Sequence, residues 1–354
     1  MEQRFDLITV QIGTLSSLLC LAKTSRKTAD NGESQYSHLI IRLNQSDTRK
    51  SGRPNGGTAS SLPGAPCGTI LDMLVDVHSH FWEYPKHFND DFRLQARRAR
   101  GADNEVDLTV RWDEYLATAE GCDKTIVFGG KAKLSGLWVP DQEIANYVAA
   151  HPDRLIGFLS VDPTQPGWQE ELIEGHQNLK LKGIKLLSMY AGFKPNDRSL
   201  DYLWEYATKH ALPVLLHTGT TFVAQAPLEC TLPRLLDDVA TRFPEVKIIL
   251  AHLSHPYEGE CVVTIRKHPN VYADCSALHY RPFQLYNSLM LVQEYGVWDK
   301  VLFGTDYPFT TVKASIDGMR ALNDMLEGTR LPRLKTDKME QMFYRNTLDV
   351  LGIS

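Results

Sequence analysis

Asp76-Val77-His78-Ser79-His80 lies at the end of an apolar run formed by residues 73–75. Side chains alternate between the two faces of a β-strand, so we expect His78 and His80 to point the same way. By the same alternation, we expect Leu74 and Asp76 to share the face of the two histidines. Val75 and Val77 are expected on the opposite face. Two imidazoles on one face can bind a single divalent ion, because neutral imidazole is a common ligand of transition metals. His-x-His also occurs by chance, so the positions of the other histidines decide whether it marks a metal site.

Composition and charge narrow the class of protein. The chain has 354 residues, of which 43% are hydrophobic and 23% charged, as in a soluble globular protein. A net charge of −5 gives no sign of a nucleic-acid partner, and no apolar run reaches the ~18 residues of a membrane span. The six cysteines are scattered without a C-x-x-C pair, which argues against a disulfide framework and favours a reducing compartment. We therefore expect a cytoplasmic protein with no membrane partner.

Residues 1–72 differ in character from the rest of the chain. Residues 23–70 are rich in Ser, Thr, Asn, Gly, Arg and Lys and show little periodicity. Such a segment buries too little apolar surface to offset its ordering entropy, so we expect a low-complexity, disordered extension over 1–72 and a catalytic domain over 73–354. Acidic residues near the start argue against a secretory signal. A mitochondrial presequence and a natural start at Met73 both stay open.

From residue 74 the sequence repeats a short apolar segment followed by an amphipathic one. The predicted strands are Leu74–His80, Lys124–Gly129, Leu155–Val161, Gly183–Ser188, Pro213–Gly219, Lys247–Ser254, Val271–Ala277 and Val301–Asp306. The predicted helices are Asp141–Ala150, Trp168–Asn178, Leu200–His210, Leu232–Phe243, Phe283–Tyr295 and Ala314–Leu326. Apolar residues in these helical segments recur with the i, i+3, i+4, i+7 spacing of a buried face.

Strands that alternate with helices predict an α/β fold with a parallel sheet. Eight such units fit a (β/α)8 TIM barrel, for which about 250 residues are typical. The alternative is an open doubly wound sheet, which usually carries a Gly-rich phosphate turn after its first strand. Here that strand ends in His-Ser-His-Phe-Trp, which favours the barrel.

Polar residues stand at the ends of several predicted strands. They are His78 and His80 on the first, Lys185 on the fourth, His217 on the fifth, His252 and His255 on the sixth, and Asp306 on the eighth. Any one of them could be a buried structural residue. However, the carboxyl ends of barrel strands converge on the active site, so residues collected there from separate strands predict a metal centre.

These motifs resemble the amidohydrolase superfamily, in its amidohydrolase-related branch of barrel hydrolases and decarboxylases. The matching stretches are Asp76-x-His78-x-His80, Leu216-His217-Thr218-Gly219, Leu250-Ala251-His252 and Phe303-Gly304-Thr305-Asp306-Tyr307-Pro308-Phe309, and the resemblance covers roughly residues 73–353.

The resemblance implies one divalent metal ion, usually Zn²⁺ with Mn²⁺ as the alternative. Its ligands would be His78, His80 and His217, with Asp306 as a further ligand or as the base on the metal-bound water. His252 would be the catalytic histidine that polarises the substrate or moves a proton. Binuclear relatives bridge two ions with a carboxylated lysine. In this chain, which is closer to the mononuclear branch, Lys185 is expected to face the substrate or to be structural. Relatives are often dimers, so a homodimer is expected by analogy.

Aromatic and basic residues follow several of the strand ends and could line a substrate pocket. The candidates are Trp82, Tyr84, Lys185, His255, Tyr280 and Arg281. Arginine pairs with carboxylates through two hydrogen bonds, so these residues suggest a small, flat or carboxylated substrate. The predicted function is a metal-dependent hydrolase acting on an amide, lactone or ester bond. The alternatives are a metal-dependent decarboxylase of an aromatic or unsaturated acid, and an inactive barrel that serves as a binding protein.

Overall fold

The computed structural model describes residues 73–101, 104 and 106–353. Its strands are β1 (Val75–His80), β2 (Lys124–Phe128), β3 (Lys131–Ala132), β4 (Leu137–Trp138), β5 (Leu155–Gly157), β6 (Leu159–Ser160), β7 (Ile184–Leu186), β8 (Val214–Leu216), β9 (Ile248–Leu250), β10 (Val271–Asp274) and β11 (Val301–Leu302). The short pair β3–β4 is an antiparallel hairpin, and the other strands run parallel to their neighbours.

Helices follow the strands as the sequence predicts. The α-helices are α1 (Asp90–Ala99), α2 (Trp112–Thr118), α3 (Asp141–Ala150), α4 (Trp168–Ile173), α5 (Ser188–Ala191), α6 (Asp201–His210), α7 (Pro233–Arg242), α8 (Glu258–Lys267), α9 (Pro282–Tyr295), α10 (Val312–Arg320), α11 (Thr336–Phe343) and α12 (Thr347–Leu351). Shorter turns are the π-helical η1 (Glu174–Asn178) and the 3₁₀ segments η2 (Arg198–Leu200), η3 (Leu228–Cys230), η4 (Ala251–Ser254), η5 (Trp298–Lys300) and η6 (Ala321–Leu326).

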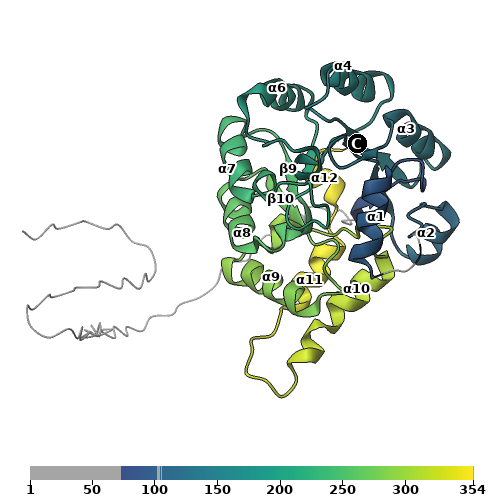
Figure 1. Ribbon diagram of the computed structural model, residues 1–354. Helices are drawn as coiled ribbons and strands as arrows, with labels where there is room; N and C mark the ends of the chain where they lie inside the picture. Colours follow the sequence, from purple (N-terminus) through teal and green to yellow (C-terminus); the bar gives the residue numbers. More distant parts are fainter. Residues whose placement is uncertain (1–72, 102–103, 105, 354) are drawn as a thin grey trace, which may run out of the picture. The chain divides into compact units, whose positions relative to one another are not determined.

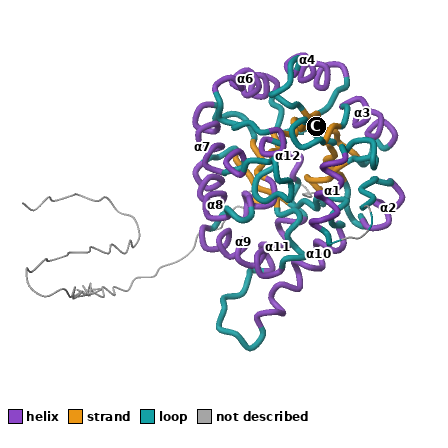
Figure 2. Tube along the Cα trace, viewed as in Figure 1, coloured by secondary structure: helices purple, strands orange, loops and turns teal. Residues whose placement is uncertain are grey.

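The parallel strands form a (β/α)8 barrel, which confirms the predicted fold. Their order is β1-β2-β5 and then β6-β7-β8-β9-β10-β11. β5 and β6 are two parts of one barrel strand, separated at Phe158, whose backbone N–H turns to the carbonyl of Val127 at 2.9 Å. The barrel closes between its last and first strands, where Val77 N donates to Phe303 O at 3.0 Å. Figure 1 shows the helices α3, α4, α6, α7, α8 and α9 ringed around the strands, and Figure 2 shows the strands gathered at the centre.

Two hydrophobic clusters account for this architecture. The smaller one fills the barrel and includes Val75, Val77, Phe128, Phe158 and Leu215. The larger one lies between the strands and the surrounding helices, and most of its strand residues alternate with those of the inner cluster. A parallel sheet covered on both faces explains why the strands read as nearly continuous apolar runs.

The first strand departs from the simple alternation that the sequence suggests. Val75 and Val77 belong to the inner cluster, whereas Leu74 belongs to the outer one. His78 also points inward, with its ring 5.1 Å from that of Phe128, because the register of β1 against β2 shifts between Asp76 and Ser79. A β-bulge places two successive residues on the same face of a strand. The histidines do share a face, as predicted, but the prediction that Leu74 and Asp76 share it with them was wrong.

The sixth predicted strand is shorter than expected. Strand β9 ends at Leu250, and Ala251–Ser254 form η4, in which His252, Leu253 and Ser254 have φ values of 60°, 45° and 55°. Residues other than glycine rarely adopt this conformation, and it costs about 1–3 kcal/mol where it occurs. The prediction of strand up to Ser254 was therefore wrong at its end.

Four predictions lie beyond what the structure tests. The boundary at residue 73 and the nature of the extension depend on residues 1–72, which are outside the described residues. The homodimer and the cellular compartment also stay predictions. Within the described residues, no helix combines the length and the apolar character needed to cross a membrane.

Candidate metal centre and pocket

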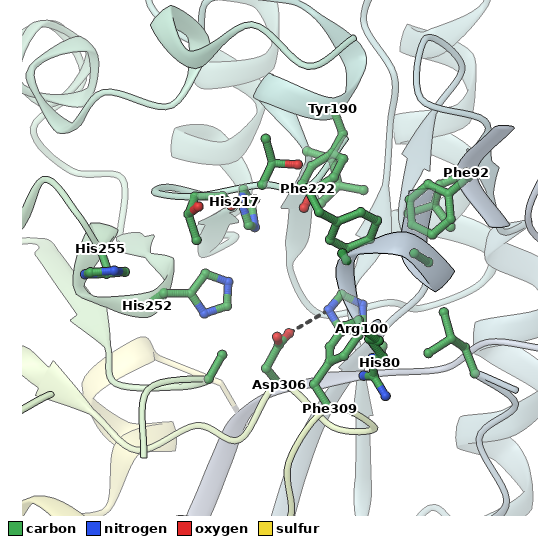
Figure 3. Close-up of a pocket in the computed structure, with 18 of the residues that line it drawn as sticks. His80, Phe92, Arg100, Tyr190, His217, Phe222, His252, His255, Asp306 and Phe309 are labelled. Atoms are coloured by element: carbon green, nitrogen blue, oxygen red, sulfur yellow. Dashed lines mark hydrogen bonds and ion pairs between the residues drawn. The ribbon is translucent and has the colours of Figure 1, made fainter. Parts of the chain in front are cut away.

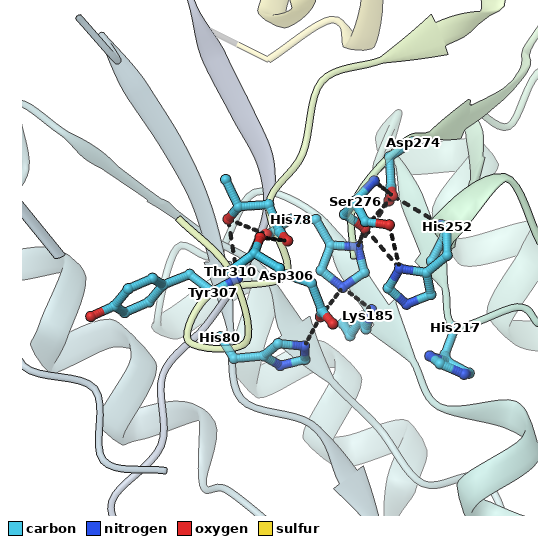
Figure 4. Close-up of polar contacts among 12 residues, drawn as sticks. His78, His80, Lys185, His217, His252, Asp274, Ser276, Asp306, Tyr307 and Thr310 are labelled. Carbon is cyan, nitrogen blue, oxygen red and sulfur yellow. Dashed lines mark hydrogen bonds and ion pairs between the residues drawn. The ribbon is translucent and has the colours of Figure 1, made fainter. Parts of the chain in front are cut away.

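Three predicted ligands meet at the carboxyl end of the barrel. The Oδ1 atom of Asp306 lies 3.2 Å from Nε2 of His78 and 3.1 Å from Nε2 of His80 (Figure 4). All three side chains are buried. Atoms bound to a tetrahedral zinc ion at ~2.0–2.2 Å lie roughly 3.3–3.5 Å from one another, so these separations are close to what one ion requires. Two nitrogens and one carboxylate oxygen also form a donor set that suits zinc or manganese. The residues therefore fit a divalent metal ion.

The electrostatic environment favours the protonation states that ligands need at Asp306 and His80, whereas it favours a protonated His78. Burial alone would raise the pKa of Asp306, but hydrogen bonds from His78 and His80 outweigh it and hold that pKa well below its ordinary value. Burial lowers the pKa of His80 to about 4. Burial and the charge of Lys185 oppose a protonated His78, yet Asp274 and Asp306 raise its pKa above the ordinary value. A bound cation would therefore replace a proton on His78.

A hydrogen-bonded anchor joins the strand of His78 to the turn of Asp306. The carboxylate of Asp76 accepts from the backbone N–H of His78 at 3.1 Å and from Thr305 N and Oγ1 at 2.9 and 2.7 Å. Asp306 has a φ of 68° and donates its N–H to the carbonyl of His78 at 2.7 Å. These bonds hold a strained backbone that aims the Asp306 side chain at the histidines.

His217 lies at the same pocket but outside this cluster. Its Nε2 atom is 3.0 Å from the carbonyl of Thr220, so it donates its proton there. Its ring is 5.1 Å from that of His252, and burial together with the charge on His252 lowers its pKa well below the ordinary value. Within the described residues, the donor atoms that group around Asp306 are those of His78 and His80. The role of His217 as a ligand stays a prediction.

Lys185 lies beneath the cluster and not on the pocket wall. It is fully buried, with Nζ 3.3 Å from Nε2 of His78 and 4.2 Å from the centre of the Phe128 ring. Burial lowers its pKa to about 7. Its amine therefore contacts the predicted ligand His78 and lies apart from the lining of the pocket, as far as the described residues show.

A pocket of about 480 Å³ opens above the cluster (Figure 3). Asp306, His80, His217 and His252 line its floor and walls. Its aromatic residues are Trp82, Phe92, Tyr190, Phe222, Tyr280 and Phe309. Of the predicted substrate residues, the pocket is lined by Trp82, His255, Tyr280 and Arg281, whereas Tyr84 and Lys185 lie outside its lining.

Two arginines line this pocket without an acidic partner among the described residues. The guanidinium of Arg100 lies 4.9 Å from the ring centre of Phe309, and that of Arg281 lies 4.7 Å from the ring centre of Tyr280. Arg281 donates from one guanidinium nitrogen to Tyr280 Oη at 3.1 Å, and cation–π contacts of this kind leave the other N–H groups available to an anion. Arg100 is not among the substrate residues predicted from the sequence, although it lines the pocket.

Sequence reasoning also missed two polar residues after strand β10. Asp274 and Ser276 are fully buried and contact both His78 and His252. The available signal was the Asp-x-Ser pattern at the end of an apolar strand, the same kind of position that identified the other site residues.

Solved structures with the same fold are similar over most of this chain. An uncharacterised TIM-barrel protein from Bordetella bronchiseptica has 19% identity and a TM-score of 0.56, with 79% of this chain and 98% of that one covered. A 5-carboxyvanillate decarboxylase from Novosphingobium aromaticivorans, with manganese bound, has 16% identity, a TM-score of 0.55 and coverage of 81% and 99%. A probable 2-pyrone-4,6-dicarboxylic acid hydrolase from Acinetobacter baumannii has 16% identity, a TM-score of 0.53 and coverage of 79% and 99%.

The comparison with curated proteins returned no match. A model of the amidohydrolase family matches residues 75–353, which is most of the chain and includes every residue of the centre described above. The sequence motifs, the parallel barrel and the buried histidine–carboxylate centre agree with that match, and the chain belongs to the amidohydrolase family of metal-dependent enzymes.

Proposed function

We propose that this protein is a metal-dependent hydrolase that acts on an amide, lactone or ester bond of a small, carboxylated substrate. The observation that carries the proposal is the convergence of His78 Nε2 and His80 Nε2 on Asp306 Oδ1 at the floor of the pocket. Zn²⁺ is the proposed ion and Mn²⁺ the alternative, with His217 as a third histidine ligand. A divalent ion in such a site lowers the pKa of bound water to about 7 and polarises a carbonyl group.

The protein's own residues would supply the remaining steps. Asp306 is ionised and reaches the pocket, so it can accept a proton from the attacking water. His252 lines the same pocket, where its imidazole can accept a hydrogen bond from the substrate or take up a proton at Nε2 and pass it to the leaving group. The aromatic walls exclude bulk water, and Arg100 and Arg281 can bind a carboxylate away from the reacting bond.

Decarboxylation of an aromatic acid is the second candidate. Two features favour it: the pocket is walled by aromatic rings, and similar structures include decarboxylases of substituted benzoates. In this reaction His252 would be placed to protonate the ring carbon from which carbon dioxide departs. Similar structures also include a probable pyrone dicarboxylate hydrolase, so fold alone leaves both reactions in view.

Isotope labelling separates the two reactions. The purified protein, loaded with Zn²⁺ or Mn²⁺, is incubated with a panel of aromatic acids, lactones and amides in H₂¹⁸O and, separately, in D₂O. A hydrolase incorporates one ¹⁸O atom into its product and releases no carbon dioxide. A decarboxylase releases carbon dioxide and places deuterium on the carbon that lost it. Carbon dioxide release without ¹⁸O incorporation would replace the hydrolase proposal with the second candidate.

Metal content tests the proposed centre without reference to a substrate. We expect about one divalent ion per chain, loss of the ion in His78→Ala and His217→Ala, and retention of the ion with loss of turnover in His252→Ala. His151→Ala is the matched control, because His151 stacks on Trp112 at a ring distance of 3.9 Å and does not line the pocket. A protein without metal after expression in metal-supplemented medium would refute the catalytic model.

A further inference from the structure

One buried carboxylate links the proposed metal centre to the catalytic histidine. Asp274, at the end of β10, has Oδ2 2.8 Å from Nδ1 of His78. Its Oδ1 atom accepts from Ser276 Oγ at 2.5 Å, from Ser276 N at 3.1 Å and from His252 N at 2.9 Å. Figure 4 shows Asp274 and Ser276 between the two imidazoles. His78, Asp274 and Ser276 are fully buried and His252 is buried except where it lines the pocket, so the protons between them must be distributed among a few defined partners.

The direction of the Ser276 hydroxyl proton determines which ring nitrogen of His252 carries a proton. Oδ1 of Asp274 accepts from two backbone N–H groups and a hydroxyl, and Oδ2 faces the Nδ1 atom of His78, so both oxygens are surrounded by donors and the carboxylate only accepts. Ser276 therefore gives its single hydroxyl proton to Asp274. Its Oγ atom, 2.8 Å from Nδ1 of His252, can then only accept, and its carbonyl oxygen, 3.3 Å from the same nitrogen, also accepts. His252 must carry its proton on Nδ1.

The same reasoning places a proton on Nδ1 of His78, since Asp274 Oδ2 can only accept. Nε2 of His78 is the atom that faces Asp306 at 3.2 Å. His78, His252 and Asp274 have donor atoms close enough together for an ion of their own. However, the two Nδ1 protons occupy that space and satisfy the carboxylate, so the hydrogen bonds account for the group without a second metal.

We propose that Asp274 is a positioning residue that fixes both imidazoles as Nδ1–H tautomers, acting on His78 directly and on His252 through Ser276. One carboxylate thereby keeps Nε2 of His78 free for the metal and Nε2 of His252 free for the substrate. The naming of metal and substrate rests on the proposed function, whereas the two tautomers follow from the hydrogen bonds alone. Partners of metal-bound histidines that set the tautomer in this way typically change metal affinity by 10–100-fold when altered.

Substitution of Asp274 by asparagine has a defined consequence at His78. The amide oxygen is expected to occupy the Oδ1 position, where three donors require an acceptor. The amide NH₂ then faces Nδ1 of His78, which must accept, and the imidazole proton moves to Nε2. Zn²⁺ binding then requires loss of that proton or reversal of the amide. We expect Asp274→Asn to weaken Zn²⁺ binding by at least about 10-fold.

Substitution of Ser276 tests whether this residue sets the tautomer of His252. Ser276→Ala removes the acceptor at 2.8 Å and leaves only the longer contact to the backbone carbonyl, so His252 should lose its single tautomer. Ser276 Oγ also lies 3.3 Å from Nδ1 of His78, but the shorter contact of that nitrogen to Asp274 at 2.8 Å remains, so Zn²⁺ affinity should stay within about threefold. Ser276→Thr keeps the hydroxyl group and is expected to restore the Nδ1–H tautomer of His252.

The experiment uses full-length protein labelled with ¹⁵N-histidine, whose ring-nitrogen shifts identify tautomers by NMR. His252 is recorded in metal-free and Zn²⁺-loaded protein at pH 8, and His78 in the Zn²⁺-loaded form, with resonances assigned from His78→Ala and His252→Ala. Zn²⁺ affinity is measured by chelator competition, and circular dichroism checks that each variant folds. If Asp274→Asn fails to fold, Ser276→Ala and Ser276→Thr still test whether Ser276 sets the tautomer of His252.

Nδ1–H tautomers in the wild-type protein, with the variant effects above, support the proposal. It is overturned by an Nε2–H tautomer at His252, by unchanged Zn²⁺ affinity in a folded Asp274→Asn protein, or by two Zn²⁺ ions per chain that fall to one in that variant. Failure to bind Zn²⁺ at all would refute the proposed function, while the tautomer of His252 in the metal-free protein would still decide this inference.

Discussion

Replacing Asp76 separates the effect of its hydrogen bonds from that of its charge. In Asp76→Ala, the N–H groups of His78 and Thr305 lose their acceptor in a fully buried place. Thr305 Oγ1 can redirect its proton to the carbonyl of His78 at 3.2 Å. Each orphaned buried donor costs about 1–3 kcal/mol, so two of them and the lost packing should lower the free energy of unfolding by roughly 3–5 kcal/mol.

Asp76→Asn should cost much less. The amide oxygen can keep both backbone N–H groups, and the amide NH₂ can donate to Thr305 Oγ1. That hydroxyl also accepts from Tyr307 N at 3.0 Å and can give its own proton to the carbonyl of His78. Every backbone donor then has an acceptor and only the second N–H of the amide lacks one, so we expect a loss of about 1 kcal/mol.

The assay is thermal unfolding of the metal-free proteins by calorimetry, with metal content measured in parallel. In a domain of this size about 1 kcal/mol corresponds to roughly 2–4 °C in Tm, so Asp76→Ala should lower Tm by about 6–20 °C and Asp76→Asn by less than about 4 °C. We also expect Asp76→Ala to retain less metal, because Asp76 joins the strand of His78 to the turn of Asp306. Equal losses in the two variants would show that the negative charge, and not the supply of acceptors, is what the site requires.

Two further perturbations test the packing against His78 and a buried ion pair. An added Cβ at Gly304 would lie 2.9 Å from Cβ of His78, so Gly304→Ala should destabilise the protein by about 1–3 kcal/mol and weaken metal binding. Gly259→Ala is its control, because an added Cβ meets nothing within 4 Å there, and a stability equal to that of Gly304→Ala would contradict the argument. In the wild-type protein Lys131 Nζ lies 2.8 Å from the buried carboxylate of Asp141. Lys131→Met removes this cation and leaves the carboxylate unpaired by it. Urea unfolding should show a loss of about 3–5 kcal/mol, and an unchanged midpoint would refute the importance of this pair.

The sequence determined the fold through periodicity. Eight apolar strands and the helices between them follow from the alternation of hydrophobic and polar residues, because both faces of a parallel barrel sheet must be covered. The same rule identified most of the centre, since His78, His80, His217, His252 and Asp306 all stand where barrel strands end. Positions along strands are local properties, and a sequence expresses them directly.

Tertiary structure alone decided how these residues meet. The bulge in β1 turns His78 inward beside Val77, and the positive φ of Asp306 aims its carboxylate at the histidines. Both depend on hydrogen bonds to residues more than two hundred positions apart, such as that between Asp76 and Thr305. Asp274 acquires its place between two imidazoles in the same way. Such contacts have no local pattern, because loop closure and barrel packing bring the partners together, and only the folded chain specifies them.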